Sequence, residues 1–77
     1  MDYKALDTVV LTRDIPAHGL RRGDLGTIVE AYDESGFEVE FVTASGRTSA
    51  VVTVSNSDVR PIADTDVIAV RSLDRTA

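Results

Sequence analysis

The strict alternation of apolar and acidic residues in Phe37-Glu38-Val39-Glu40-Phe41 is the feature that most constrains the fold of this chain. A period of two is typical of a half-buried β-strand, because successive side chains point to opposite faces of a sheet. We therefore expect the three apolar side chains to face a core and Glu38 and Glu40 to face solvent. No segment shows a clear helical period of 3.6 residues, so the pattern indicates β structure, with a helix as a second possibility only over residues 63–75.

Four further segments have the β-branched and apolar content of short strands, and residues rich in turn signals separate them. Pro16 and Gly19 favour turns within a long first loop, and Gly36 is expected to adopt a positive φ in a hairpin. Many short strands joined by turns are typical of a small barrel or sandwich. The four further predicted strands cover residues 8–12, 26–32, 48–54 and 59–62.

A chain of 77 residues has room for one domain. The long first loop, the meander of three strands, a single helical turn near residues 55–58 and a short closing strand predict an SH3-like barrel. We therefore expect an all-β fold, a small SH3-like barrel of about five strands that spans residues 1–77. Its core would cover residues 6–62, and residues 63–77 would form a C-terminal extension.

Residues 66–71, with the sequence Asp-Val-Ile-Ala-Val-Arg, follow the point where a five-stranded barrel is complete. They are too apolar for a solvated tail, so we expect an extra C-terminal strand. That strand has three possible partners, namely its own barrel, a second copy or a different protein. We expect the first, because a tethered segment has a high effective concentration. Residues 75–77 should be frayed.

The predicted core contains apolar residues from every predicted strand except the C-terminal one. Those of residues 37–41 are the ones that the alternation assigns to the interior. These residues are Val9, Leu11, Leu25, Ile28, Phe37, Val39, Phe41, Val52, Val54, Val59 and Ile62.

Composition restricts the function classes. The chain has no cysteine, which excludes disulfides and thiolate metal ligands. The formal net charge of −5 repels phosphate backbones, so nucleic acid is not the expected partner. No apolar run approaches the roughly 20 residues that span a bilayer, and the first residues do not resemble a secretion signal. We therefore expect a cytoplasmic protein that neither binds a membrane nor carries a cofactor.

The segment Gly23-Asp24-Leu25-Gly26-Thr27 resembles the KOW-type opening of many SH3-like barrels. In that opening the first glycine permits the turn, the aspartate caps it, and the second glycine allows close backbone approach where the barrel curves. The resemblance implies an SH3-like fold and is only weakly specific for function.

A longer resemblance rests on several segments, which include Leu6 to Leu11, Gly19-Leu20, Gly46-Arg47-Thr48 and Val59-Arg60-Pro61. Over roughly residues 5–62 these segments resemble a family of small stand-alone bacterial proteins of unknown function. This resemblance implies a protein encoded beside a small partner and supplies no catalytic residues. A weaker similarity runs to the barrels of the nitrile hydratase β subunit and its accessory proteins, although the cysteine-rich metal motif of the catalytic subunit is absent.

Two charged surfaces are candidate binding sites. Arg13, His18, Arg21 and Arg22 belong to the first long loop and are expected to form a basic patch, with solubilising loop charge as the alternative. Glu38 and Glu40, with neighbouring acidic residues of the second hairpin, are expected to form an acidic surface for a basic partner. The alternative is that these carboxylates protect the sheet against edge-to-edge pairing.

No catalytic set can be assembled from the sequence. His18 is the only histidine, and one histidine near Asp14 is too few ligands for a zinc site. We therefore expect a non-enzymatic protein-interaction module without a metal, such as the small partner or antitoxin-like neutraliser of a co-encoded bacterial protein. It would be a monomer, or a homodimer through the C-terminal strand. The alternatives are a KOW-like module that binds RNA or the ribosome, and an accessory protein of the nitrile hydratase type.

Overall fold

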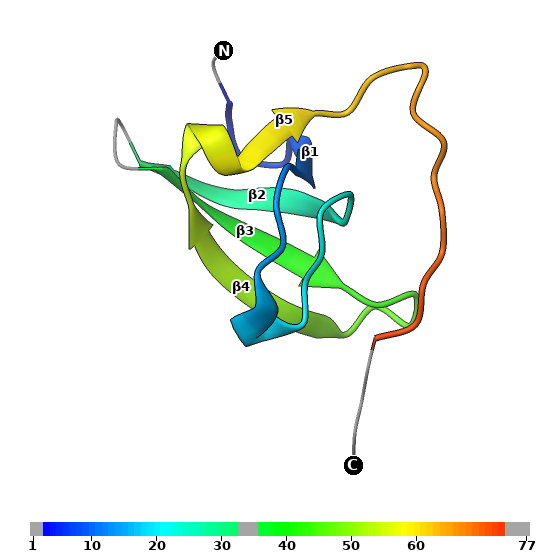
Figure 1. The fold of residues 1–77 in the computed structure, drawn as a ribbon. Helices are drawn as coiled ribbons and strands as arrows, with labels where there is room; N and C mark the ends of the chain where they lie inside the picture. The colour runs from blue at the N-terminus through cyan, green and yellow to red at the C-terminus, as the bar shows by residue number, and fades with distance from the viewer. Residues whose placement is uncertain (1–2, 33–35, 74–77) are drawn as a thin grey trace.

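The computed structural model describes residues 3–32 and 36–73. Their regular structure consists of five strands and two single 3₁₀ turns (Figure 1). The strands are β1 (Thr8–Leu11), β2 (Leu25–Tyr32), β3 (Gly36–Val42), β4 (Thr48–Val54) and β5 (Val59–Pro61), and the turns are η1 (Pro16–His18) and η2 (Asn56–Asp58). The prediction of an all-β chain is confirmed, and each of the five predicted strands forms within one residue of its expected bounds.

The strands form one antiparallel sheet in the order β4-β3-β2-β1-β5. β3 lies between β2 and β4, with Val39 opposite Ile28 on one side and Val52 on the other. An extra residue at Val29 shifts the register between β2 and β3, and such bulges increase the local twist of a sheet. The two sheet edges are therefore β4 and β5.

The core lies on one face of this sheet, and the alternation in β3 fills its centre. Phe37, Val39 and Phe41 are buried, as predicted, while Glu38 and Glu40 lie on the opposite face. Gly26 of β2 lacks the space for a side chain, since an added Cβ would overlap the Val39 Cγ1 atom and lie 2.8 Å from Phe41 Cε1. The expectation that Gly26 permits a close approach is thus confirmed.

The first loop closes one side of the core. Ile15 and Leu20 form a short β-bridge around η1, and both side chains pack in the core cluster. Figure 1 shows this loop extending from β1 to η1 and returning to β2. These two residues, together with Val10, are buried although the sequence did not predict them as core.

The core prediction was wrong at two positions. Leu25 and Ile62 are 36% and 37% exposed, because one begins β2 and the other follows the end of β5. Val52 is partly buried and packs against the core from the edge strand. The other eight predicted core residues are buried, so the expected strand faces were correct.

The prediction of an extra C-terminal strand was also wrong. Residues 66–71 form no strand, and the sheet ends with β5 at Pro61. Proline has no N–H with which to continue the ladder, and a turn held by Asp66 then leads the chain away from β5. The predicted fraying of residues 75–77 lies outside the described residues.

Candidate binding surface

Residues 62–73, which we call the strap, leave β5 and extend along one side of the molecule to the turn between β3 and β4 (Figure 1). The first fixed point of the strap is Asp66. Both terminal nitrogens of the Arg60 guanidinium donate to the Asp66 carboxylate at 2.9 Å. The backbone N–H of Ala63 donates to the same carboxylate at 2.7 Å. Together these bonds fix where the strap begins.

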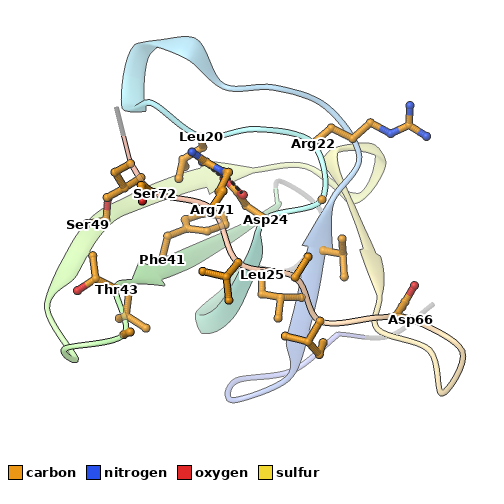
Figure 2. Close-up of a pocket in the computed structure, with 18 of the residues that line it drawn as sticks. Leu20, Arg22, Asp24, Leu25, Phe41, Thr43, Ser49, Asp66, Arg71 and Ser72 are labelled. Atoms are coloured by element: carbon orange, nitrogen blue, oxygen red, sulfur yellow. Dashed lines mark hydrogen bonds and ion pairs between the residues drawn. The ribbon is translucent and has the colours of Figure 1, made fainter. Parts of the chain in front are cut away.

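The second fixed point joins residues that are 47 positions apart in the chain. The Arg71 Nε–H donates to the Asp24 carboxylate at 2.8 Å, and Arg71 Nη2 donates to its other oxygen and, at 3.0 Å, to the Gly19 carbonyl (Figure 2). Asp24 also accepts the backbone N–H of Arg21 at 2.8 Å, which caps the turn before β2. The strap is therefore attached to the first loop by a bidentate ion pair.

Both carboxylates that hold the strap have pKa values below their ordinary range. The hydrogen bonds from Arg60 are the main cause for Asp66, with a pKa lowered to about 2. Burial by itself would raise the pKa of Asp24, but the hydrogen bonds from Arg71 and the Arg21 amide outweigh it and leave the pKa lowered. Both groups are thus ionised at neutral pH, and both attachments are intact there.

Between the two attachments the strap exposes an apolar segment. Val67, Ile68 and Val70 are 89%, 61% and 97% exposed. Among the described residues, no backbone hydrogen bond involves residues 67–73. The segment therefore offers both apolar side chains and unused main-chain groups to its surroundings.

A cleft of about 830 Å³ lies between the strap and the sheet. Val10, Leu20, Leu25 and Phe41 line it from the body of the domain, and Figure 2 shows Leu25 in the middle of the group. Val10 is buried without belonging to the core cluster, so its environment is this cleft. The strap thus lies over a largely apolar floor without filling the space beneath it.

Of the four residues of the predicted basic patch, one forms an ion pair and the other three are exposed. The Arg13 Nε–H pairs with Asp58 beside η2 at 2.7 Å, which raises the pKa of Arg13 and lowers that of Asp58. His18 lies exposed in η1. Arg21 and Arg22 are exposed near the attachment of the strap, and Figure 2 shows Arg22 pointing away from the cleft.

The predicted acidic residues Glu38 and Glu40 lie on the outer face of β3 and accept hydrogen bonds from the neighbouring strand. The Thr53 hydroxyl lies 2.6 and 2.9 Å from the two oxygens of Glu38, and the Thr48 hydroxyl donates to Glu40 at 2.5 Å. Because β3 is an inner strand, these carboxylates do not protect a sheet edge.

The strap attachments were not predicted from the sequence. An aspartate and an arginine flank the apolar run at Asp66 and Arg71, and this flanking is the only local signal of a segment fixed at both ends. The identity of the partners, Arg60 and Asp24, depends on the folded structure. In the described ranges, 3–32 and 36–73, no three residues of the His, Cys, Asp and Glu types gather into a metal-binding group. No helix of these ranges is long and apolar enough to cross a membrane.

Comparison with known proteins identifies one family. No curated protein and no solved structure matches the chain. A family model described as a domain of unknown function, DUF4926, matches residues 5–61, which is more than half of the chain. The match contains all five strands and the first loop and ends where the strap begins. The chain therefore belongs to the DUF4926 family of domains of unknown function.

Proposed function

We propose that this domain is a non-enzymatic protein-interaction module and that its strap presents residues 66–71 to a protein partner. The observation that carries the proposal is the exposed apolar segment with unused main-chain groups, held at both ends by Arg–Asp pairs. An extended segment of this kind can add a strand to the sheet edge of another protein.

The attachment of the strap at both ends lowers the entropy cost of binding a partner. A free tail loses conformational entropy when it is ordered on a partner, and this loss weakens the affinity. Asp66 and Arg71 already fix the two ends of the segment in the isolated domain. Part of the ordering cost is thus met during folding, as in other preorganised binding segments.

We also propose an architecture for the domain and a kind of protein partner. The strand order, the long first loop and the 3₁₀ turn between β4 and β5 support assignment to the SH3-like barrels. The proposed partner is a co-encoded bacterial protein, which the domain would bind as a small partner or an antitoxin-like neutraliser. A strand added in trans suits this role, because its main-chain bonds give affinity and its alternate side chains give specificity.

A KOW-like RNA-binding module is the second candidate. In the described part of the chain, the guanidinium groups of Arg21 and Arg22 form no salt bridge, unlike those of Arg13, Arg60 and Arg71. Both side chains are exposed and adjacent, as a contact with phosphate groups requires. The net charge of −5 opposes this function, which is why we rank it second.

Affinity capture from the native host with matched variants tests the proposal. We expect the double variant Val67→Ser/Val70→Ser to lose a protein that the parent chain retains, because both changes remove apolar side chains from the strap. Both valines are almost fully exposed and contribute little to folding, so the variant should still fold. Val29→Ser, at an exposed valine of β2, is the control and should retain that protein. Quantitative mass spectrometry of the bound fraction measures the difference.

The Arg21→Ser/Arg22→Ser variant separates the two candidates. Protein capture should survive this change, since the strap is untouched. Retention of the partner by the double valine variant would contradict the proposal. Bound RNA that decreases steeply with salt and disappears in the arginine variant would favour the second candidate.

A further inference from the structure

The two edges of the sheet differ in how well they are protected. β5 has three residues, one of which is Pro61, and its Arg60 side chain is held by Asp66. β4 has seven residues, Thr-Ser-Ala-Val-Val-Thr-Val, with neither a charge nor a proline. Proteins usually protect edges with short strands, lysine, proline or bulges, because an open edge pairs with other chains. The one irregularity of β4, an extra residue at Ser49, lies near its start and leaves residues 50–54 in regular register with β3.

The outward side of β4 also forms no backbone hydrogen bonds to the other described residues. β4 pairs with β3 alone, and no turn or loop in the described residues forms a backbone hydrogen bond to residues 48–54. Val51, at the middle of the strand, is 50% exposed. An uncharged edge strand in a chain of net charge −5 is therefore available for pairing.

We propose that β4 is a homodimer interface, in which it pairs antiparallel with β4 of a second copy about a two-fold axis at Val51. This inference is independent of the strap and of the function proposed for it. The dimer joins two five-stranded sheets into one continuous sheet. No third copy can add through this interface, because each β4 uses its only free side.

The sequence of β4 is complementary to itself in this register. Pairing about Val51 places Ala50 opposite Val52 and Ser49 opposite Thr53, so that within residues 49–53 apolar residues meet apolar ones and polar residues meet polar ones. Only the end pair, Thr48 and Val54, is mixed. Opposite residues in an antiparallel pair lie on the same face, about 4.5–5.5 Å apart at Cβ. No charged residue of one β4 faces a charged residue of the other.

The acidic residues of the neighbouring strand do not prevent this pairing. Glu38 and Glu40 lie one strand inward, and hydroxyl groups of their own chain bind both carboxylates. The two β3 strands of the dimer would be three strand spacings apart, or roughly 14 Å. At physiological ionic strength this exceeds the screening length of about 8 Å.

Sedimentation equilibrium over a range of protein concentrations tests the interface. The full chain should approach twice its mass of 8.3 kDa as concentration rises. Val51→Lys should remain a monomer, because two lysines would meet on the two-fold axis, and Val51→Glu should remain a monomer for the same reason. An equimolar mixture of the two variants should dimerise again, because each pair then has opposite charges. This rescue also excludes misfolding as the cause of the loss.

Val70→Lys is the matched control, since it places the same charge on the exposed strap. It should dimerise as the parent does. The proposal is overturned if the parent chain stays monomeric at every concentration, or if Val51→Lys and Val51→Glu each dimerise alone. It is also overturned if Val70→Lys abolishes the dimer while Val51→Lys does not, because the strap would then be the interface.

Discussion

Replacing Phe41 by alanine is expected to lower the free energy of unfolding by about 3–5 kcal/mol. The Phe41 side chain is 3% exposed, and its ring occupies the space beside Gly26 where any other residue would have a Cβ. Removal of the ring leaves a space over Gly26 on the core face of the sheet that the paired strands cannot close. A domain of this size has little stability in reserve, so the variant should be largely unfolded at modest urea concentrations.

Val42→Ala is the control for this substitution. Val42 is the next residue of β3 and is 56% exposed, so its truncation should cost less than about 1 kcal/mol. Urea unfolding followed by circular dichroism gives both values. Equal midpoints for the two variants would mean that the alternation in β3 has been assigned to the wrong faces.

Gly36→Ala is expected to cost about 2–5 kcal/mol, through backbone strain and steric overlap together. Gly36 begins β3 with φ of +127°, a region that favours glycine. An added Cβ would overlap the carbonyl oxygen of Val54, and backbone atoms of a paired strand cannot move away as a flexible side chain can.

Gly46→Ala separates the two contributions. Gly46 also has a positive φ, of +86°, but nothing lies within 4 Å of the position that a Cβ would occupy there. Its replacement should therefore cost only the conformational part, about 1–2 kcal/mol. Thermal unfolding of the two variants measures the difference, and a Gly46→Ala variant as unstable as Gly36→Ala would show that contact with Val54 is unimportant.

The strands were predictable because their signals are local. Alternation in β3 assigned three buried residues and two outward glutamates, and the β-branched runs located the other strands. Ile15 and Leu20 were missed because they pack from a loop, where burial follows no period. Leu25 and Ile62 were misassigned because the position of a residue at a strand end decides its exposure.

The path of the strap could not be predicted from local signals. Residues 66–71 have the composition of a strand, but a strand also needs a neighbour with free main-chain groups. Pro61 has no N–H with which the edge of β5 could pair with this segment, and the salt bridge from Arg71 to Asp24 holds the segment against the first loop. The ion pair of Arg13 was missed for a similar reason, because its partner Asp58 lies 45 residues later in the chain.

Amide hydrogen exchange of the full chain tests whether the strap offers an unpaired segment, on which the proposed function depends. In the free protein the amides of Val67, Ile68 and Val70 should exchange as fast as in an unfolded peptide, because no backbone acceptor binds them. Those of Val39 and Phe41 should exchange only when the domain opens, and binding of the partner should slow the strap amides. If the strap amides of the free chain are as protected as those of β3, the segment is already paired within the domain and the proposed function is wrong.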